Sequence, residues 1–164
     1  MQTLDNLFLS TLKDIYYAER QILKALPKMA KAADSRELAD GFTQHRAQTQ
    51  KQIERLQEVF EILGKRAAGV TCEAINGIIE ECEELLDEDK TASPIRDAGL
   101  AACGQAVEHY EISRYGTLIA WSKHMGQDRI AELLEETLDE EKQTDQDLTM
   151  LSEQILMENR QAAK

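Results

Sequence analysis

The chain is poor in the residues that interrupt helices or cross-link a fold. Its 164 residues include only 2 prolines, 8 glycines and 3 cysteines. Proline and glycine are the residues least suited to a helix interior, so their scarcity favours helix throughout. Cys72, Cys82 and Cys103 are an odd number of cysteines without CxxC spacing. We therefore expect reduced, partly buried thiols and neither a zinc site nor a disulfide.

Long apolar runs are also missing. No stretch of 18 apolar residues occurs, so we predict no helix that spans a membrane. Residues 1–12 lack a basic segment followed by an apolar run, so no signal peptide is expected. The 19 basic and 31 acidic side chains give a formal net charge of −12, which repels nucleic acids and anionic membrane surfaces. These absences predict a cytoplasmic protein that binds neither nucleic acid nor membrane.

Helical periodicity is what the sequence has in abundance. It predicts helices at about residues 3–32, 36–63, 72–88, 94–124 and 127–158, with a kink at Pro27 in the first. The connection 64–93 is long enough to travel the length of a bundle, so the long helices on either side of it are expected to be parallel. We predict a single all-α domain over residues 1–164, a four-helix bundle with an additional short helix in the long crossover.

Polar residues interrupt the apolar stripe of each long helix near its midpoint. The residues at these inward or edge positions are Glu19, His45, Gln48, Thr49, Gln52, Glu108, Glu111 and Glu141. An inward carboxylate must be paired, neutralised or bound to a metal, because burying a bare one costs several kcal/mol. The central stripes contain no inward Lys or Arg that could pair with it.

The shared level of these interruptions predicts a metal site. Four polar interruptions at one level of a bundle can converge, as in carboxylate-bridged dinuclear sites. Ligands rich in oxygen with one imidazole suit iron or manganese better than zinc or copper. Two other interpretations stay open: the carboxyls could be protonated and hydrogen-bonded, and His45 could be a core histidine with satisfied hydrogen bonds. Thr49 is expected to hydrogen-bond its glutamine neighbours.

Two further polar residues lie close to the predicted level. Asp145 follows Glu141 by one turn, and it could either hydrogen-bond a ligand or pair with Lys142. Tyr115 follows Glu111 by one turn, and it could be a hydrogen-bonded core tyrosine or a group that holds a ligand in place. Trp121 lies off the inner stripe, so we expect it on the crossover helix or at a subunit interface.

Four segments resemble the YciF family of ferritin-like bacterial stress proteins, which are related to rubrerythrin. The matching segments are Tyr17–Gln21, His45–Gln52, Val107–Ile112 and Glu135–Lys142. The resemblance implies a ferritin-like bundle, usually dimeric, with a dinuclear iron or manganese site. It also implies ferroxidase- or catalase-like oxidoreductase chemistry on Fe(II) with peroxide or O2 during stress.

The resemblance also implies roles for individual residues. Glu19, His45, Glu108, Glu111 and Glu141 match the inward positions of the family. We take these five as the metal ligands and expect no catalytic residue beyond them. Gln48 stands where the family commonly has Glu, so Gln48 and Gln52 are expected to be weak oxygen ligands or to hydrogen-bond the ligands. The competing interpretation is a non-enzymatic stress protein whose polar core holds no metal.

Overall fold

The computed structural model describes residues 3–162, in which all regular structure is α-helical. The helices are α1 (Leu4–Ala32), α2 (Arg36–Ile62), α3 (Glu73–Glu88), α4 (Pro94–His124) and α5 (Asp128–Ala162). The predicted starts and ends agree to within one residue except at the end of α5, which continues four residues beyond the predicted Glu158. Residues 1–2 and 163–164 of the predicted domain lie outside the described part.

Local sequence signals explain these boundaries. Ser35 and Ser93 accept hydrogen bonds from the backbone N–H groups three residues later, at 3.2 and 3.1 Å, and so cap α2 and α4. Gly64 and Gly126 follow α2 and α4 with φ of 64° and 70°, a conformation that glycine adopts without steric cost. Pro27 lies inside α1 and is exposed, and the helix continues past it to Ala32; the kink expected there stays a prediction.

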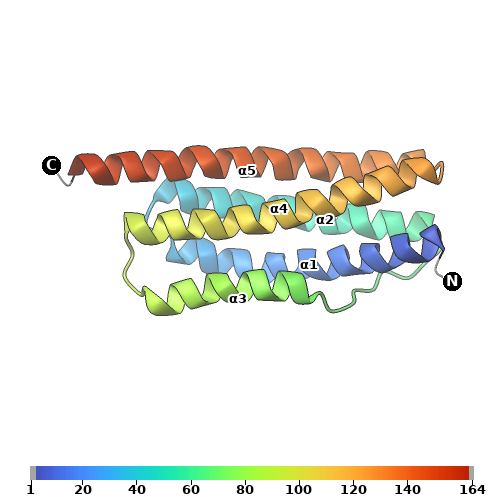
Figure 1. Ribbon diagram of the computed structural model, residues 1–164, viewed down its shortest axis with the longest axis horizontal. Helices are drawn as coiled ribbons and strands as arrows, with labels where there is room; N and C mark the ends of the chain where they lie inside the picture. The colour runs from blue at the N-terminus through green and yellow to red at the C-terminus, as the bar shows by residue number, and fades with distance from the viewer. Residues whose placement is uncertain (1–2, 163–164) are drawn as a thin grey trace.

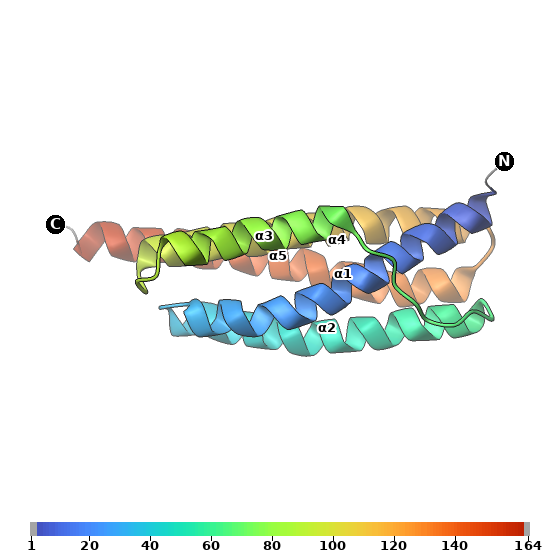
Figure 2. The same ribbon diagram turned by 90° about the horizontal axis from the view of Figure 1, so that it is seen from below.

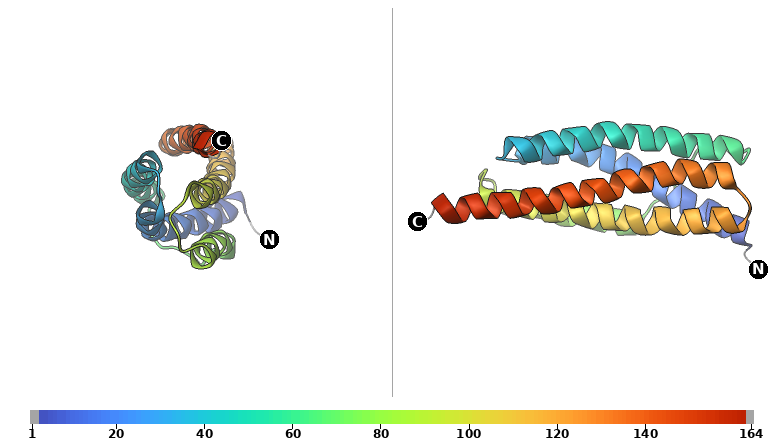
Figure 3. Two further views of the ribbon diagram at one scale, coloured as in Figure 1. Left: turned by 90° about the vertical axis from the view of Figure 1, so that its left-hand side faces the viewer. Right: turned by 90° about the horizontal axis from the view of Figure 1, so that it is seen from above.

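The five helices form a ferritin-like four-helix bundle with one long crossover. Helices α1 and α2 form one antiparallel hairpin, and α4 and α5 form the other (Figure 1). The chain between α2 and α4 returns along the bundle as α3, so α2 and α4 run in the same direction, as predicted (Figure 3). Helix α3 packs on the outside of α1 and α4 (Figure 2), so the bundle itself is made by α1, α2, α4 and α5.

A contact far from the polar level fixes one end of the bundle. Asp97 in α4 is 1% exposed and accepts hydrogen bonds from the backbone N–H groups of Asp34 at 2.8 Å and Ser35 at 2.6 Å. Arg96 donates to the backbone carbonyls of Ala32 and Asp89. These two side chains therefore tie the α1–α2 turn to the end of the crossover, a contact that helical periodicity does not predict.

Apolar side chains fill the bundle on both sides of a polar level. Leu100 and Val107 of α4 are buried before Glu108, and Tyr115 and Leu118 are buried after Glu111. Tyr16 and Phe60 join α1 to α2 through an edge-to-face ring contact with centroids 5.5 Å apart. The polar level is therefore flanked on both sides by buried apolar side chains. None of the described helices has an apolar stretch long enough to cross a membrane.

Candidate metal centre

Three helices bring together four side chains that could hold a metal ion. His45 comes from α2, Glu108 and Glu111 from α4, and Glu141 from α5. One nitrogen or oxygen atom of each lies within 4.8 Å of the corresponding atoms of the other three. All four side chains are buried, with exposed fractions of 0–3%. Residues separated by up to 96 positions in the sequence thus meet at one level of the bundle, as the central polar interruptions indicate.

The fourth helix of the bundle places Glu19 beside this cluster. Glu19 is completely buried, and its Oε1 accepts a hydrogen bond from the hydroxyl of Tyr115. Its other oxygen, Oε2, has no hydrogen-bond partner. Glu19 lies close enough to Glu111 and Glu141 for their charges to act on one another, but it is not one of the four residues whose atoms converge most closely. Tyr115 is thus a buried, hydrogen-bonded tyrosine whose partner is Glu19, a contact that fits both of its predicted roles.

The cluster contains more buried polar atoms than it can satisfy internally. Both carboxylate oxygens of Glu111 lack hydrogen-bond partners, as do one oxygen each of Glu108 and Glu141. His45 Nε2 lies 3.1 Å from Glu108 Oε1 but without hydrogen-bond geometry, and Nδ1 has no partner. Among the described residues, no Lys or Arg pairs with any carboxylate of the cluster. Buried acceptors without donors are the arrangement that a bound cation completes, so the donor set fits divalent metal ions.

Burial also changes the proton affinity of the cluster. Loss of hydration raises the pKa of Glu19 from 4.5 to about 8, and the nearby charge of Glu141 adds to the effect. The pKa values of Glu108 and Glu111 are raised well above the ordinary value, again chiefly by burial. Without a cation the folded protein therefore favours protonated carboxyls at this level. A metal ion would have to displace those protons, which makes binding dependent on pH.

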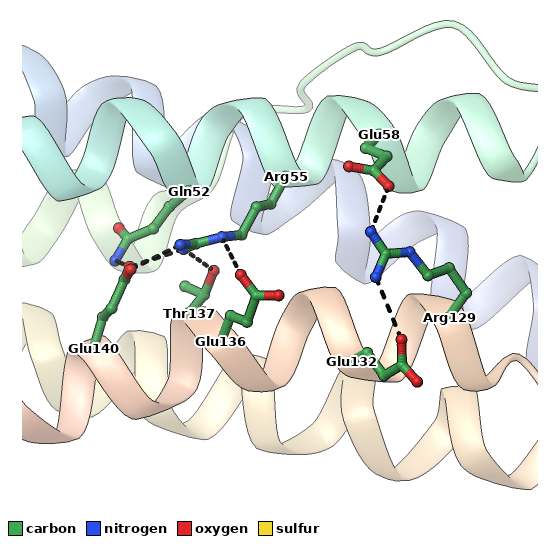
Figure 4. Close-up of polar contacts among 8 residues, drawn as sticks. All are labelled: Gln52, Arg55, Glu58, Arg129, Glu132, Glu136, Thr137 and Glu140. Carbon is green, nitrogen blue, oxygen red and sulfur yellow. Dashed lines mark hydrogen bonds and ion pairs between the residues drawn. The ribbon is translucent and has the colours of Figure 1, made fainter.

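Hydrogen bonds between α2 and α5 hold one side of the cluster. The amide nitrogen of Gln52 donates to Glu141 Oε1 and, at 3.0 Å, to Glu140 Oε2. Arg55 binds Glu140 through two nitrogens at 2.8 and 2.7 Å and also contacts Thr137 and Glu136 (Figure 4). The nitrogen of Gln52 thus hydrogen-bonds Glu141, while its Oε1 is buried without a hydrogen-bond partner.

The remaining candidates lie at the periphery. Gln48 is half-buried and lies outside the four-residue cluster. Asp145 pairs with His109 at 3.1 Å and accepts from Gln105 at 3.2 Å, so it makes neither of the two predicted contacts, the one to a ligand or the one to Lys142. Thr49 donates to the carbonyl of His45 at 2.9 Å and not to a glutamine side chain, because a helical threonine readily reaches the carbonyl four residues earlier.

The sequence analysis did not predict that Arg55 and Glu140 pair beside the cluster, although their positions in the sequence point to that level of the bundle. Arg55 follows Gln52 by three residues on α2, and Glu140 directly precedes Glu141 on α5. The pairing depends on which side chains cross from one helix to the next, and helical periodicity within one segment does not specify it.

The similarity to known proteins extends over the whole fold. A family model described as "Domain of unknown function (DUF892)" matches residues 3–161. Protein YciF of Escherichia coli (strain K12) is 41% identical over 153 residues, which cover 93% of this chain and 92% of that protein. The crystal structure of the E. coli stress protein YciF matches with a TM-score of 0.90 at 40% identity, covering 95% of this chain and 98% of that chain. YcfI from Rhodopseudomonas palustris matches with a TM-score of 0.86 at 52% identity, covering 90% and 94%.

Proposed function

Because the chain belongs to the DUF892 family, we propose that it is a stress protein whose buried cluster binds two iron or manganese ions and acts on peroxide or O2. The similarity to the E. coli stress protein YciF supports the physiological setting. The metal is proposed from the site itself. Glu111 carries the proposal, since it is completely buried and neither of its oxygens has a hydrogen-bond partner.

The residues of the site divide into ligands and groups that orient them. Glu19, Glu108, Glu111 and Glu141 would supply carboxylate ligands to the ions, and His45 would supply the nitrogen. A metal pair held there would supply two-electron redox chemistry toward peroxide or O2.

The surrounding side chains keep these ligands in position. The hydroxyl of Tyr115 fixes one oxygen of Glu19, and the amide of Gln52 fixes one oxygen of Glu141. Arg55 in turn binds Glu140, which shares the amide of Gln52. Buried apolar side chains lie on both sides of the level, so the ligands would meet an incoming ion in a largely apolar setting.

A metal-free stress protein is the second candidate function. The observation in its favour is the pKa of Glu19, raised to about 8, because a carboxyl that stays protonated at neutral pH needs no cation. Metal content separates the two candidates. We expect purified protein, after incubation with Fe(II) or Mn(II) and desalting, to retain metal by elemental analysis, with one of the two positions only partly filled because Gln48 offers no carboxylate. A Glu108→Ala/Glu141→Ala double variant should retain almost none.

Thermal stability provides a second test of whether the protein binds metal. A bound metal stabilises only the folded state, so a chelator should lower the Tm of the wild type and leave the Tm of the double variant unchanged. Equal sensitivity of both proteins to the chelator, with equal metal content, would favour the metal-free candidate.

A further inference from the structure

A cavity of about 90 Å³ lies beside the candidate metal centre. His45 and Glu108 contribute to its wall, whereas the rest of the cluster does not. It also touches exposed side chains, among them Lys28 of α1 and Gln143 of α5, so it connects the buried cluster with the protein surface. Any molecule that enters it therefore approaches the cluster from the side of His45 and Glu108.

Most of the buried wall is apolar. The buried apolar side chains along it are Ile22, Leu26, Met29, Phe42, Val107 and Leu148. Where the wall meets the cluster, it is formed by His45 and Glu108, whose Nδ1 and Oε2 atoms have no hydrogen-bond partner. An apolar wall with unpartnered polar atoms at one end suits a molecule that has an apolar body and a polar head.

The volume limits the size of that molecule. One water needs roughly 10–15 Å³ of such space, and a cavity of about 150 Å³ in another protein holds benzene. A cavity of about 90 Å³ is thus larger than hydrogen peroxide or O2 requires. It suits a body of a few carbon atoms, with further atoms extending toward the exposed end.

The charges of the cluster limit the charge that the polar head of the entering molecule can carry. Two divalent cations carry four positive charges, which the four carboxylates Glu19, Glu108, Glu111 and Glu141 balance. An anionic head would then add an unbalanced charge in a buried setting, which is strongly unfavourable. An uncharged head is therefore favoured over a carboxylate or a phosphate.

From this cavity we infer that the peroxide substrate is a small alkyl hydroperoxide, whose alkyl group occupies the apolar wall beside His45 and Glu108. This inference rests on the proposed function. The reaction breaks the O–O bond of ROOH: with two electrons from two M(II) ions and two protons, one oxygen leaves as the alcohol ROH and the other as H2O.

Gly41 offers a way to fill the cavity without disturbing the cluster. It belongs to the cavity wall, and a Cβ at this position would meet only Leu151, at an ordinary 3.8 Å. Gly77 of α3 is a matched control, since it is an exposed helical glycine with nothing within 4 Å of an added Cβ. Ala25→Leu narrows the same cavity from α1 and serves as a second variant if Gly41→Leu does not fold.

The first measurement compares kcat/KM for tert-butyl hydroperoxide and H2O2 in metal-loaded protein. Wild type should prefer tert-butyl hydroperoxide. In Gly41→Leu, kcat/KM for tert-butyl hydroperoxide should fall roughly 10-fold or more, because the substrate no longer fits the apolar pocket. Its kcat/KM for H2O2 should stay within twofold of wild type. Gly77→Leu should match wild type for both substrates.

The second measurement needs no metal. The product analogue tert-butyl alcohol should shift the methyl NMR signals of Val107 and Leu148 in metal-free wild type and Gly77→Leu, and should leave them unshifted in Gly41→Leu. A preference for H2O2, or unchanged alcohol binding in Gly41→Leu, would overturn the inference and leave the proposed function standing. Failure of the fully metal-loaded wild type to consume either peroxide would instead overturn the proposed function itself.

Discussion

At Glu19 the loss of water on folding raises the pKa of the carboxyl to about 8, with Glu141 as the second cause. The folded, metal-free protein therefore keeps a proton that the unfolded chain releases near pH 4.5. A group whose pKa is raised by folding stabilises the protein fully at low pH and loses that contribution as the pH rises toward the folded value. Glu108 and Glu111 change the stability with pH in the same direction, because folding also raises their pKa values.

We therefore expect the free energy of unfolding of chelator-treated protein to fall between about pH 5 and pH 8. The slope should be about 1.4 kcal/mol per pH unit for each proton that only the folded state retains. Urea denaturation at several pH values measures it. A Glu19→Gln variant, which cannot ionise there, should show a flatter dependence. A stability that rises over this range in metal-free wild type would contradict the prediction.

Gln48 supports a prediction about metal affinity. A neutral amide offers one carbonyl oxygen and cannot bridge two cations as a carboxylate can. Gln48 is half-buried and contacts the same cavity as His45 and Glu108. We expect Gln48→Glu to raise metal content and Fe(II)-dependent peroxide consumption, and His45→Ala to lower both.

The matched control for the added charge is Gln44→Glu, because Gln44 contacts the cavity but is exposed. It should leave metal content unchanged. If Gln48→Glu has no effect while His45→Ala still lowers metal content, then Gln48 does not bind the metal. If neither change has an effect, α2 supplies no ligand.

The sequence predicts the burial of individual residues better than their hydrogen bonds. Glu19, His45 and Glu141 are buried as their positions on the apolar stripes indicate, because the period of 3.6 residues determines which face a side chain occupies. The helical period does not predict the hydrogen-bond partners of Gln52 and Asp145. Each of these side chains contacts a neighbouring helix, and such contacts depend on the side-chain rotamer and on the axial offset between the helices.

At the scale of elements, the α1–α2 turn depends on a side chain from α4. Replacing Asp97 by Ala removes both acceptors for the backbone N–H groups of Asp34 and Ser35. Hydrogen bonds to a charged group contribute more than neutral ones, so we expect a loss of about 2 kcal/mol or more in the free energy of unfolding. Asp97→Asn, which keeps one acceptor oxygen, should lose less.

Asp97 also lies in the first turn of its helix, where a negative charge is favourable. Asp128→Ala is the control for that effect, because Asp128 is an exposed acid in the first turn of α5. Its urea midpoint should change much less. Equal losses in the two variants would assign the role of Asp97 to helix electrostatics and not to the turn.

Most helix boundaries were predictable because local residues specify them. Ser35 and Ser93 cap their helices, and glycines with positive φ follow α2 and α4. The end of α5 was not predictable in the same way, since residues 159–162 continue the helix without a stop signal such as Gly or Pro. The contact of α3 with both α1 and α4 likewise depends on tertiary packing.

At the scale of the whole molecule, the resemblance to the YciF family predicts a homodimer, and Trp121 tests it. Trp121 is half-buried and packs against the core of the bundle, which leaves part of the ring exposed. If a second copy covers that part, Trp121→Glu should shift the sedimentation coefficient toward that of a monomer. Met157→Glu is the control, because Met157 is 62% exposed on the last part of α5. A dimer that persists in Trp121→Glu would place the subunit interface elsewhere.

The parallel course of α2 and α4 also affects the order in which the protein assembles. The two hairpins close through short turns, whereas contacts between them require the long crossover loop to close, which is slower. Glu108, Glu111 and Glu141 all belong to the α4–α5 hairpin, while Glu19 and His45 belong to the other. We expect a cation present during folding to be captured first by the three carboxylates of α4–α5. The ion would then act as a template on which the α1–α2 hairpin docks, adding its imidazole and its carboxylate last.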